Sequence, residues 1–272
     1  MSRARLAGAG VLVLLLAALL GPVVAPYEAT AMELERRLEG PSLDHPLGLD
    51  ELGRDVFSRL LEGARISVLV GLSVVGVAGT IGTLLGALAG ALGGRWDTAL
   101  MRLIDVFLAF PGILLAIALV AVLGPALLHV VFALVAIGWV GYARLARGQV
   151  LQLRELEYVL AARAAGVPTG RLVFRHLLPN VMPLVLVQAS LGLAGAILAE
   201  ASLSFLGLGI QPPAPSWGAM INAGRSHLLD APHVTLFPGL AILLSVLALN
   251  FLGDALVERI DPRLRGRSGP GA

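Results

Sequence analysis

The 272-residue sequence contains no cysteine and no lysine, and only 14% of its residues are charged. Without cysteine the chain can form neither disulfide bonds nor thiolate metal sites. Without lysine it lacks the side chain with which a P-loop reaches the β- and γ-phosphates of a nucleotide, so a standard ATP site is excluded. Any ATP hydrolysis linked to this chain therefore has to occur in another protein.

Catalytic and metal-binding spacings are also missing from the sequence. The five histidines do not follow a spacing such as His-Glu-x-x-His, and neither a Gly-x-Ser-x-Gly elbow nor a pair of catalytic carboxylates occurs. We expect no enzymatic activity, and no metal or other cofactor bound by this chain. The net charge of +2 does not indicate nucleic-acid binding, because the arginines are dispersed and no aromatic residues are interleaved with them.

Apolar residues dominate what is present. They make up 57% of the chain, and the mean hydropathy of +0.86 implies more apolar surface than a soluble core can hide. A hydrocarbon core of about 30 Å takes roughly 20 helical residues, and long apolar runs without alternation fit helices and not a barrel. The sequence predicts an all-α integral membrane protein with six spans. They fall near residues 6–24, 66–92, 100–123, 125–146, 181–209 and 234–256.

The first apolar stretch imitates a secretory signal peptide, with arginines before it and Val23, Val24 and Ala25 at its end. Pro26 directly after Ala25 argues against cleavage, so we interpret residues 6–24 as a retained membrane anchor. The chain then divides into the anchor with an external segment, a transmembrane domain and a cytoplasmic tail. Their ranges are 1–64, 65–260 and 261–272, with a cytoplasmic loop at about 150–180.

Charge placement predicts the orientation of the spans. With the N-terminus in the cytoplasm, 14 of the 20 arginines fall at or near the inner face and 6 lie outside. Ten of the 18 carboxylates lie instead in the external loops. Because cytoplasmic loops carry the excess of basic residues, both termini are expected in the cytoplasm.

Glycines and prolines inside the spans indicate how the helices pack and bend. Four glycines recur every four residues on one face of the second span, so another helix can approach its backbone closely. Pro111 and Pro238 each remove a backbone hydrogen bond and should bend the third and sixth spans. Both prolines are hinge candidates, with static kinks as the favoured alternative. The four glycines are Gly82, Gly86, Gly90 and Gly94.

Two carboxylates lie inside or near the edge of the apolar spans. A charged carboxylate at a helix centre costs about 2.5 to 3.5 kcal/mol on the insertion scale, so each should face a partner, the protein interior or a watery cavity. For Asp105 we favour an ion pair with Arg102, one turn earlier. Glu200 has no arginine within a turn. Its role stays open between a buried polar contact and a pathway or gate shared with Ser202 and Ser204.

A polar, arginine-rich insert separates the fourth and fifth spans. Residues 157–165 are strong helix formers, residues 166–170 contain helix breakers, and a short amphipathic segment then leads to Pro179, which opens the next span. The pattern predicts a helix, a turn and a helix on the cytoplasmic surface. Such an alanine-rich knob can seat in a groove of another protein. The alternative is an interfacial helix that binds anionic lipid through its arginines.

The insert resembles the cytoplasmic loop of permease subunits of ABC importers, whose pattern is Glu-Ala-Ala, three residues, Gly, nine residues, then Ile-x-Leu-Pro. Two positions depart from this pattern, with Leu160 in place of glutamate and His176 in place of isoleucine. The loss of glutamate weakens the expectation of a salt bridge to the ATPase. The residues that match at the required spacing are Ala161, Ala162, Gly166, Leu178 and Pro179.

Further motifs extend the resemblance over nearly the whole chain. Seven of them, in the right order, are similar to the second permease of dipeptide, oligopeptide and nickel importers, which have the type I importer fold. They are His45 to Asp55, Asp105 to Pro111, Glu157 with Tyr158, Arg175 to Asn180, Glu200 to Gly209, Pro215 to Gly218 and Leu252 to Asp254.

The resemblance implies a set of partners in the bacterial cytoplasmic membrane. A homologous second permease would complete the pathway, two ABC ATPase subunits would hold ATP and Mg²⁺, and an extracytoplasmic binding protein would deliver the solute. Peptides are favoured as the solute, with nickel or another small solute as alternatives. The residues of the coupling loop to the ATPase are Glu157, Tyr158, Ala161, Ala162, Arg163, Gly166, Arg175, His176, Leu178 and Pro179.

Other assignments stay open at this point. The outer segments His45–Arg59 and Gln211–Arg225 are candidates for the face toward the binding protein, or for loop packing alone. A proton-coupled secondary transporter would need titratable groups at mid-membrane and often an inverted repeat. Glu200 is the one such group we single out, and no repeat between the halves is evident. A scaffold protein would need no pathway.

Overall fold

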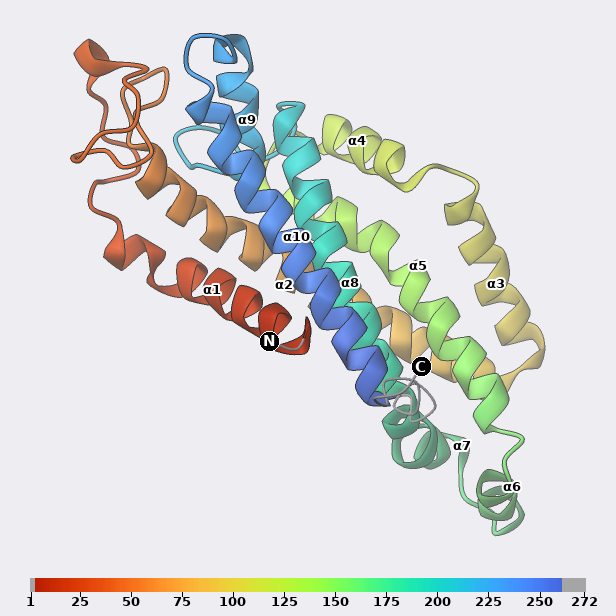
Figure 1. The fold of residues 1–272 in the computed structure, drawn as a ribbon. Helices are drawn as coiled ribbons and strands as arrows, with labels where there is room; N and C mark the ends of the chain where they lie inside the picture. Colours follow the sequence, from red (N-terminus) through yellow and green to blue (C-terminus); the bar gives the residue numbers. More distant parts are fainter. Residues whose placement is uncertain (1–2, 261–272) are drawn as a thin grey trace.

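The structure, a computed structural model, describes residues 3–260, and every regular element in that range is a helix (Figure 1). The expected all-α class is confirmed. The expected tail, residues 261–272, lies outside the described residues. The long helices are α1 Arg3–Val24, α2 Val56–Leu92, α3 Gly94–Leu108, α4 Gly112–Leu123, α5 Leu127–Leu153, α8 Leu178–Phe205 and α10 His233–Ile260. The short ones are η1 Leu34–Arg36, α6 Glu157–Ala164, α7 Thr169–Leu172, η2 Val173–Leu177, α9 Trp217–Gly224 and η3 Arg225–His227.

Five of the helices are long and apolar enough to cross a membrane, and α3 with α4 makes a sixth span if the two are counted together. These two helices meet at an angle of 81° across the break at residues 109–111. The structure therefore fits the expected six spans. The third span is broken at residues 109–111, and its second part is α4. By contrast, α10 continues from His233 to Ile260 as one helix that includes Pro238.

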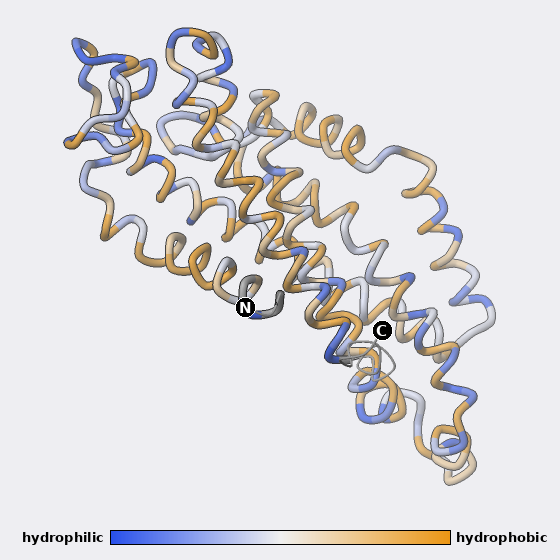
Figure 2. Tube along the Cα trace, in the orientation of Figure 1, coloured by the Kyte–Doolittle hydropathy of each residue, from blue (hydrophilic) through white to orange (hydrophobic). Residues whose placement is uncertain are grey.

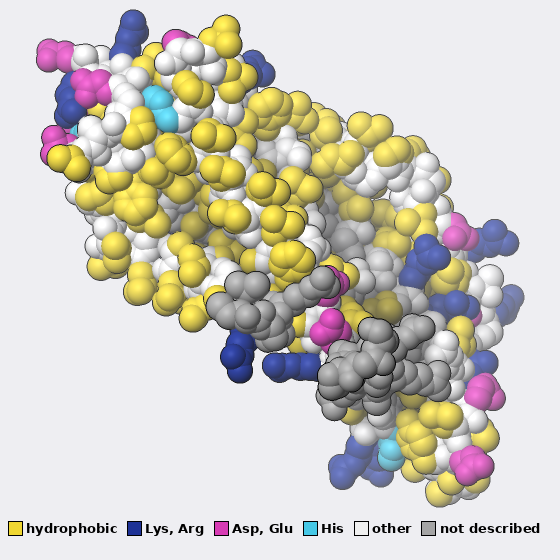
Figure 3. All heavy atoms as spheres, in the orientation of Figure 1, with side chains coloured by type: hydrophobic (Ala, Val, Ile, Leu, Met, Phe, Trp, Pro, Cys, Tyr) yellow, Lys and Arg dark blue, Asp and Glu magenta, His cyan; other side chains and the backbone are white. Residues whose placement is uncertain are grey.

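Helices α2, α5, α8 and α10 run alongside one another between two ends of the molecule, and α3 and α4 form a bent pair at the edge of this bundle (Figure 1). One end carries α6 and α7, and we call it the α6 pole. The other carries α9 and the loop of residues 25–55, and we call it the α9 pole. Apolar residues dominate the helices between the poles (Figure 2), and charged side chains gather at the two ends of a broad hydrophobic band (Figure 3).

The second span begins earlier than the apolar run near residue 66 suggests. Helix α2 starts at Val56, and the side chain of Asp55 caps it by accepting a hydrogen bond from the backbone N–H of Ser58 at 2.8 Å. Arg59 and Ser58 are buried in this first turn. Because Ser58 and Arg59 are polar, they do not belong to the apolar run from which the span was predicted. Their buried partners are visible only in the folded loop.

Helix α2 packs closely on α5 through three of its glycines. A Cβ atom added to Gly82 or Gly86 would collide with the carbonyl oxygens of Trp139 and Ala143, and one on Gly90 would lie 3.1 Å from the carbonyl oxygen of Arg147. The packing face predicted from the four-residue spacing is confirmed for these three. It was wrong for Gly94, which opens α3 and has open space where a Cβ would stand.

The expected ion pair between Arg102 and Asp105 is absent from the described ion pairs, and Asp105 is exposed. Instead Asp97, at the start of α3, pairs with Arg147 of α5, whose Nη2 donates to Asp97 Oδ2 at 2.7 Å. Arg154 Nη1 also donates to the carbonyl oxygen of Gly90 at 3.2 Å. Partners from different helices thus hold α3 and α2 against α5 near the α6 pole.

Replacing Gly86 with alanine should lower the free energy of unfolding by about 1–3 kcal/mol, because the added methyl group overpacks the contact with Ala143. The matched control is Gly76→Ala on the same helix, where a Cβ meets nothing within 4 Å. That control should be neutral or stabilising by up to about 1 kcal/mol. Thermal unfolding of the detergent-solubilised variants measures both, and equal effects would contradict the close contact.

Candidate functional site

The insert at the α6 pole is a short helix, a turn and a second short helical segment, as expected. Helix α6 ends where Gly166 adopts a positive φ of 77°, a conformation that glycine takes without strain. The backbone N–H of Val167 donates to the carbonyl oxygen of Ala162 at 3.1 Å and closes this end. Pro168 then precedes α7, which continues through the π-helical turn η2 into α8.

Buried apolar side chains anchor the insert to the bundle. Val159 of α6 is fully buried, and Leu172, Val173 and Leu177 are buried in the same cluster. This cluster also contains Ile104 of α3 together with buried residues of α5 and α8. The insert is therefore a packed extension of the transmembrane bundle.

The insert exposes several large apolar side chains. Leu156, Tyr158 and Leu160 have exposed fractions of 46%, 44% and 46%, and Phe174 reaches 60%. Apolar side chains that stay exposed at a polar end of a protein often mark a contact with another protein. We call these four residues the α6 apolar set. Leu160, which replaces the glutamate of the family pattern, belongs to it.

The structure brings most of the proposed coupling residues to one pole, but it gives them different degrees of burial. Asn180 links the two ends of the insert, since its Nδ2 donates to the Tyr158 hydroxyl at 3.4 Å and to the His176 carbonyl oxygen at 2.7 Å. Ala162, His176 and Leu178 are half-buried. The exposed residues are Glu157, Tyr158, Ala161, Arg163, Gly166, Arg175 and Pro179.

Glu200 lies in a buried polar contact between helices. Its exposed fraction is 0%, and its carboxylate accepts hydrogen bonds from Ser67 of α2 at 3.2 Å and from Ser204 of α8 at 2.7 Å. The Ser204 hydroxyl also accepts from the backbone N–H of Ile210 at 3.3 Å. Ser202 is not part of this cluster, because its hydroxyl donates to the Leu198 carbonyl oxygen within α8.

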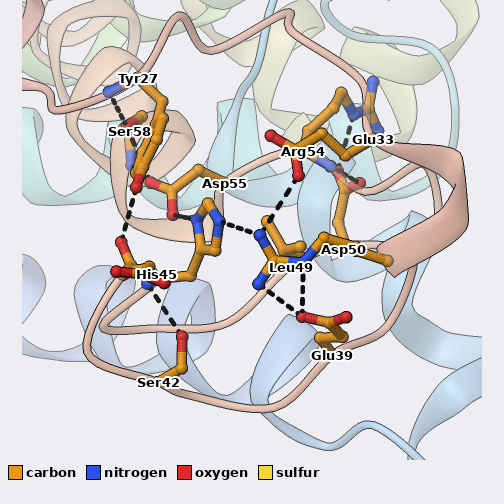
Figure 4. A network of polar contacts seen from close by, with 12 residues as sticks. Tyr27, Glu33, Glu39, Ser42, His45, Leu49, Asp50, Arg54, Asp55 and Ser58 are labelled. Carbon is orange, nitrogen blue, oxygen red and sulfur yellow. Dashed lines mark hydrogen bonds and ion pairs between the residues drawn. The ribbon is translucent and has the colours of Figure 1, made fainter.

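A second polar network folds the loop before α2 (Figure 4). His45 Nδ1 lies 3.0 Å from Asp55 Oδ1, while Asp55 Oδ2 accepts from the backbone N–H and the hydroxyl of Ser58, both at 2.8 Å. Arg36 Nη1 lies 3.2 Å from His45 Nε2. Arginine can only donate, so Nε2 accepts and His45 donates from Nδ1 to Asp55.

The same loop contains a buried ion-pair group. Arg54 Nε donates to Asp50 Oδ2 at 2.7 Å, and Arg59 Nε lies 3.3 Å from the same oxygen. The half-buried Arg36 donates to Glu39, and this hydrogen bond raises the pKa of the Arg36 guanidinium. In the sequence analysis Asp50 and Arg54 appear only as part of a family motif, and Arg59 only as the end of an outer segment. The alternation of acidic and basic residues just before an apolar span is the signal for the network.

The two outer segments singled out in the sequence meet at the α9 pole. Trp217 Nε1 of α9 donates to the Leu60 carbonyl oxygen of α2 at 2.9 Å, and His233 Nε2 donates to the Leu49 carbonyl oxygen at 3.1 Å. Beyond α9, a hydrogen bond from His227 lowers the pKa of Asp230. Val56 and the partly buried Leu47 of the first segment belong to the same apolar cluster as Trp217 and Met220 of the second, so the two segments pack together at this pole.

Five or six apolar helical spans with one polar insert define a multi-pass membrane protein. The chain belongs to the family of binding-protein-dependent transport system inner membrane components, whose family model matches residues 82–266. The resemblance to ABC importer permeases, including the type I importer fold, is confirmed by this match.

Several curated relatives are similar over nearly the whole chain. A glutathione transport system permease protein of Pectobacterium atrosepticum is 48% identical, and the match covers 95% of this chain and 86% of that protein. A dipeptide transport system permease protein of Alkalihalophilus pseudofirmus is 44% identical over 92% of this chain and 83% of that protein. A glutathione transport system permease protein of Escherichia coli is 45% identical, with 94% and 85% covered.

Replacing Asp55 with alanine should destabilise the folded loop by about 2–4 kcal/mol, because it leaves the buried His45 N–H without an acceptor and removes the N-cap of α2. Hydrogen exchange measures this as lost protection of backbone amides such as that of Leu49, which bonds the Glu39 carbonyl. Asp44→Ala is the matched control, since the Asp44 side chain is exposed. Equal exchange in both variants would show that the network does not hold the loop.

Proposed function

We propose that this chain is one of two homologous permease subunits of an ATP-driven importer that carries dipeptides or oligopeptides across the bacterial cytoplasmic membrane. The observation that carries the proposal is the insert at the α6 pole, which is anchored by buried residues and exposes the α6 apolar set. The names of the relatives support a peptide solute, because dipeptides and glutathione are both peptides.

In this proposal the α6 pole is cytoplasmic and docks on an ATPase partner. ATP and Mg²⁺ bind to two ATPase subunits, since this chain has no lysine for a P-loop. Closure of the ATPase pair on ATP moves the insert. Because Val159 and Leu172 pack in the same cluster as α5 and α8, the movement is transmitted to those helices as a rigid body.

The α9 pole faces an extracytoplasmic binding protein in this proposal. The loop before α2 and the segment around α9 supply its surface, and the buried networks of His45 and Asp50 keep that surface in one shape. A preformed surface lowers the entropy cost of binding a partner. The sequence left open whether these two segments contact the binding protein or serve loop packing alone. In this proposal they do both.

A proton-coupled transporter has no support from the comparisons. Family membership favours a transport subunit that works with a binding protein. The coupling loop is the part of the chain on which the proposal is tested most directly.

Co-purification of the tagged protein from mild detergent should recover a second permease and P-loop ATPases. A protein that purifies alone would contradict the proposal.

Gly166→Arg should abolish ATP-dependent uptake while the protein remains in the membrane. The larger residue adds bulk at the docking face and strain at a φ of 77°. Gly166→Asn is the matched control, because asparagine tolerates positive φ better than other residues. Uptake into proteoliposomes measures both variants. Normal uptake by Gly166→Arg would remove the basis for the coupling-loop assignment.

Single cysteines can test the sidedness because the natural chain has none. Leu43→Cys, in the loop at the α9 pole, should react with an impermeant maleimide in right-side-out vesicles. Thr169→Cys, in α7, should react in inside-out vesicles only. Both positions are exposed, so access to the reagent decides the result. The reverse pattern would place the α6 pole outside the cell.

A further inference from the structure

Two hollows lie end to end along one face of the bundle, where α2, α5 and α8 meet. The first has a volume of about 330 Å³ and also touches α4, and the second has a volume of about 300 Å³ and lies beside the start of α8. Val75 and Tyr142 line both, so the two hollows adjoin at these residues. We call the two hollows together the α2–α5–α8 groove.

The groove has no charged wall. Every described residue that lines it is apolar, a glycine or an uncharged polar residue. Its polar side chains are one amide and three hydroxyls, on Gln188, Tyr142, Thr80 and Thr83. Proteins bind divalent transition metals with imidazole, thiolate or carboxylate ligands. The groove offers none of these groups and therefore does not suit a bare metal cation.

Two of the polar groups lack partners among the described residues. The Thr83 side chain is only 4% exposed, and its hydroxyl has no hydrogen bond. The side-chain amide of Gln188 makes no hydrogen bond within the described chain either; its backbone carbonyl accepts a long one, 3.4 Å, from the Tyr142 hydroxyl. An unmet buried hydroxyl costs about 1–3 kcal/mol. Water or a solute in the groove would supply the missing hydrogen bonds.

Helix α8 leaves room beside the amide. Gln188, Gly192, Gly195 and Ala199 follow one another at spacings of four, three and four residues, so they share one face of the helix. A Cβ on Gly192 would approach the Tyr142 hydroxyl to 2.5 Å. Glycine at this position keeps the space that the hydroxyl occupies.

We propose that the α2–α5–α8 groove is the wall that this chain contributes to the solute pathway, and that Gln188, Tyr142 and Thr83 bind the backbone of a passing peptide. The inference rests on the proposed importer function. Amide and hydroxyl side chains both donate and accept, which matches the N–H and C=O groups of a peptide bond. Because the wall has no fixed charge, peptides with acidic and basic side chains pass it alike.

Thiol labelling tests whether the groove is a watery path. Thr80→Cys and Gln188→Cys place a thiol in the groove, and Leu85→Cys and Leu186→Cys place one at exposed positions on the far sides of the same helices. Each variant is assembled with its partner subunits in membrane vesicles. A hydrophilic thiol reagent should react with the groove thiols roughly tenfold or more faster, because a thiol in lipid does not ionise.

Addition of ATP and the binding protein should change the labelling rate of the groove thiols and leave the controls unchanged. Equal rates at groove and control positions in every nucleotide state would overturn the pathway assignment. In that case lipid or the second permease covers the groove.

A charge placed at Gln188 tests the solute class. The ratio of alanyl-glutamate uptake to alanyl-lysine uptake should be at least about fivefold lower in the Gln188→Glu complex than in the unaltered complex. The reason is that the added carboxylate repels the acidic peptide. Gln188→Leu should lower uptake of both peptides and leave the ratio unchanged. An unchanged ratio in a Gln188→Glu complex that still transports would overturn the role of Gln188.

The two levels of the proposal fail in different ways. If the unaltered complex contains ATPases but takes up neither peptide with ATP, the peptide assignment of the groove is wrong while the importer assignment stands. If no ATPase accompanies the chain, the proposed function itself is wrong. If the groove thiols are labelled but a charge at Gln188 has no effect, the groove is a pathway whose peptide contacts lie elsewhere. That outcome contradicts the inference.

Discussion

The close contact between α2 and α5 is the constraint on which the rest of the bundle depends. Gly82, Gly86 and Gly90 bring the two helices together with almost no side chain between them. In lipid, apolar surface alone gives little drive for helices to associate, so such contacts and interhelical hydrogen bonds have to provide it. The resulting register sets Arg147 beside Asp97 and places Tyr142 at the middle of the groove.

Polar contacts between elements then determine which other parts of the chain meet. Asp97 with Arg147 joins α3 to α5, Glu200 joins α8 to α2, and His45 with Asp55 joins the N-terminal loop to the start of α2. The contacts of Glu200 and of His45 with Asp55 are buried, and a buried polar group that loses its hydrogen-bond partner costs about 1–3 kcal/mol. Their effect is therefore to penalise other arrangements of the same helices.

The sequence was sufficient for features that depend on periodicity within one helix. The apolar runs predicted the six spans, and the glycine spacing predicted the face of α2 that packs on α5. It failed where partners are distant in the chain: Asp105 was matched to Arg102, whereas the ion pair of α3 is made by Asp97 with Arg147. The coupling loop was predicted as a helix, turn and helix, and its role stays a prediction. The groove was missed because its four polar residues are spread over three apolar helices.

The uncharged groove also has an electrical consequence. A membrane voltage does work only on charges that move through its field, about 2.3 kcal/mol for each elementary charge and 100 mV. The walls that α2, α5 and α8 present to the groove carry no such charge. Movement of the groove walls therefore carries no side-chain charge of the groove through the field. Within the groove the voltage acts only on the charge of the molecule that occupies it.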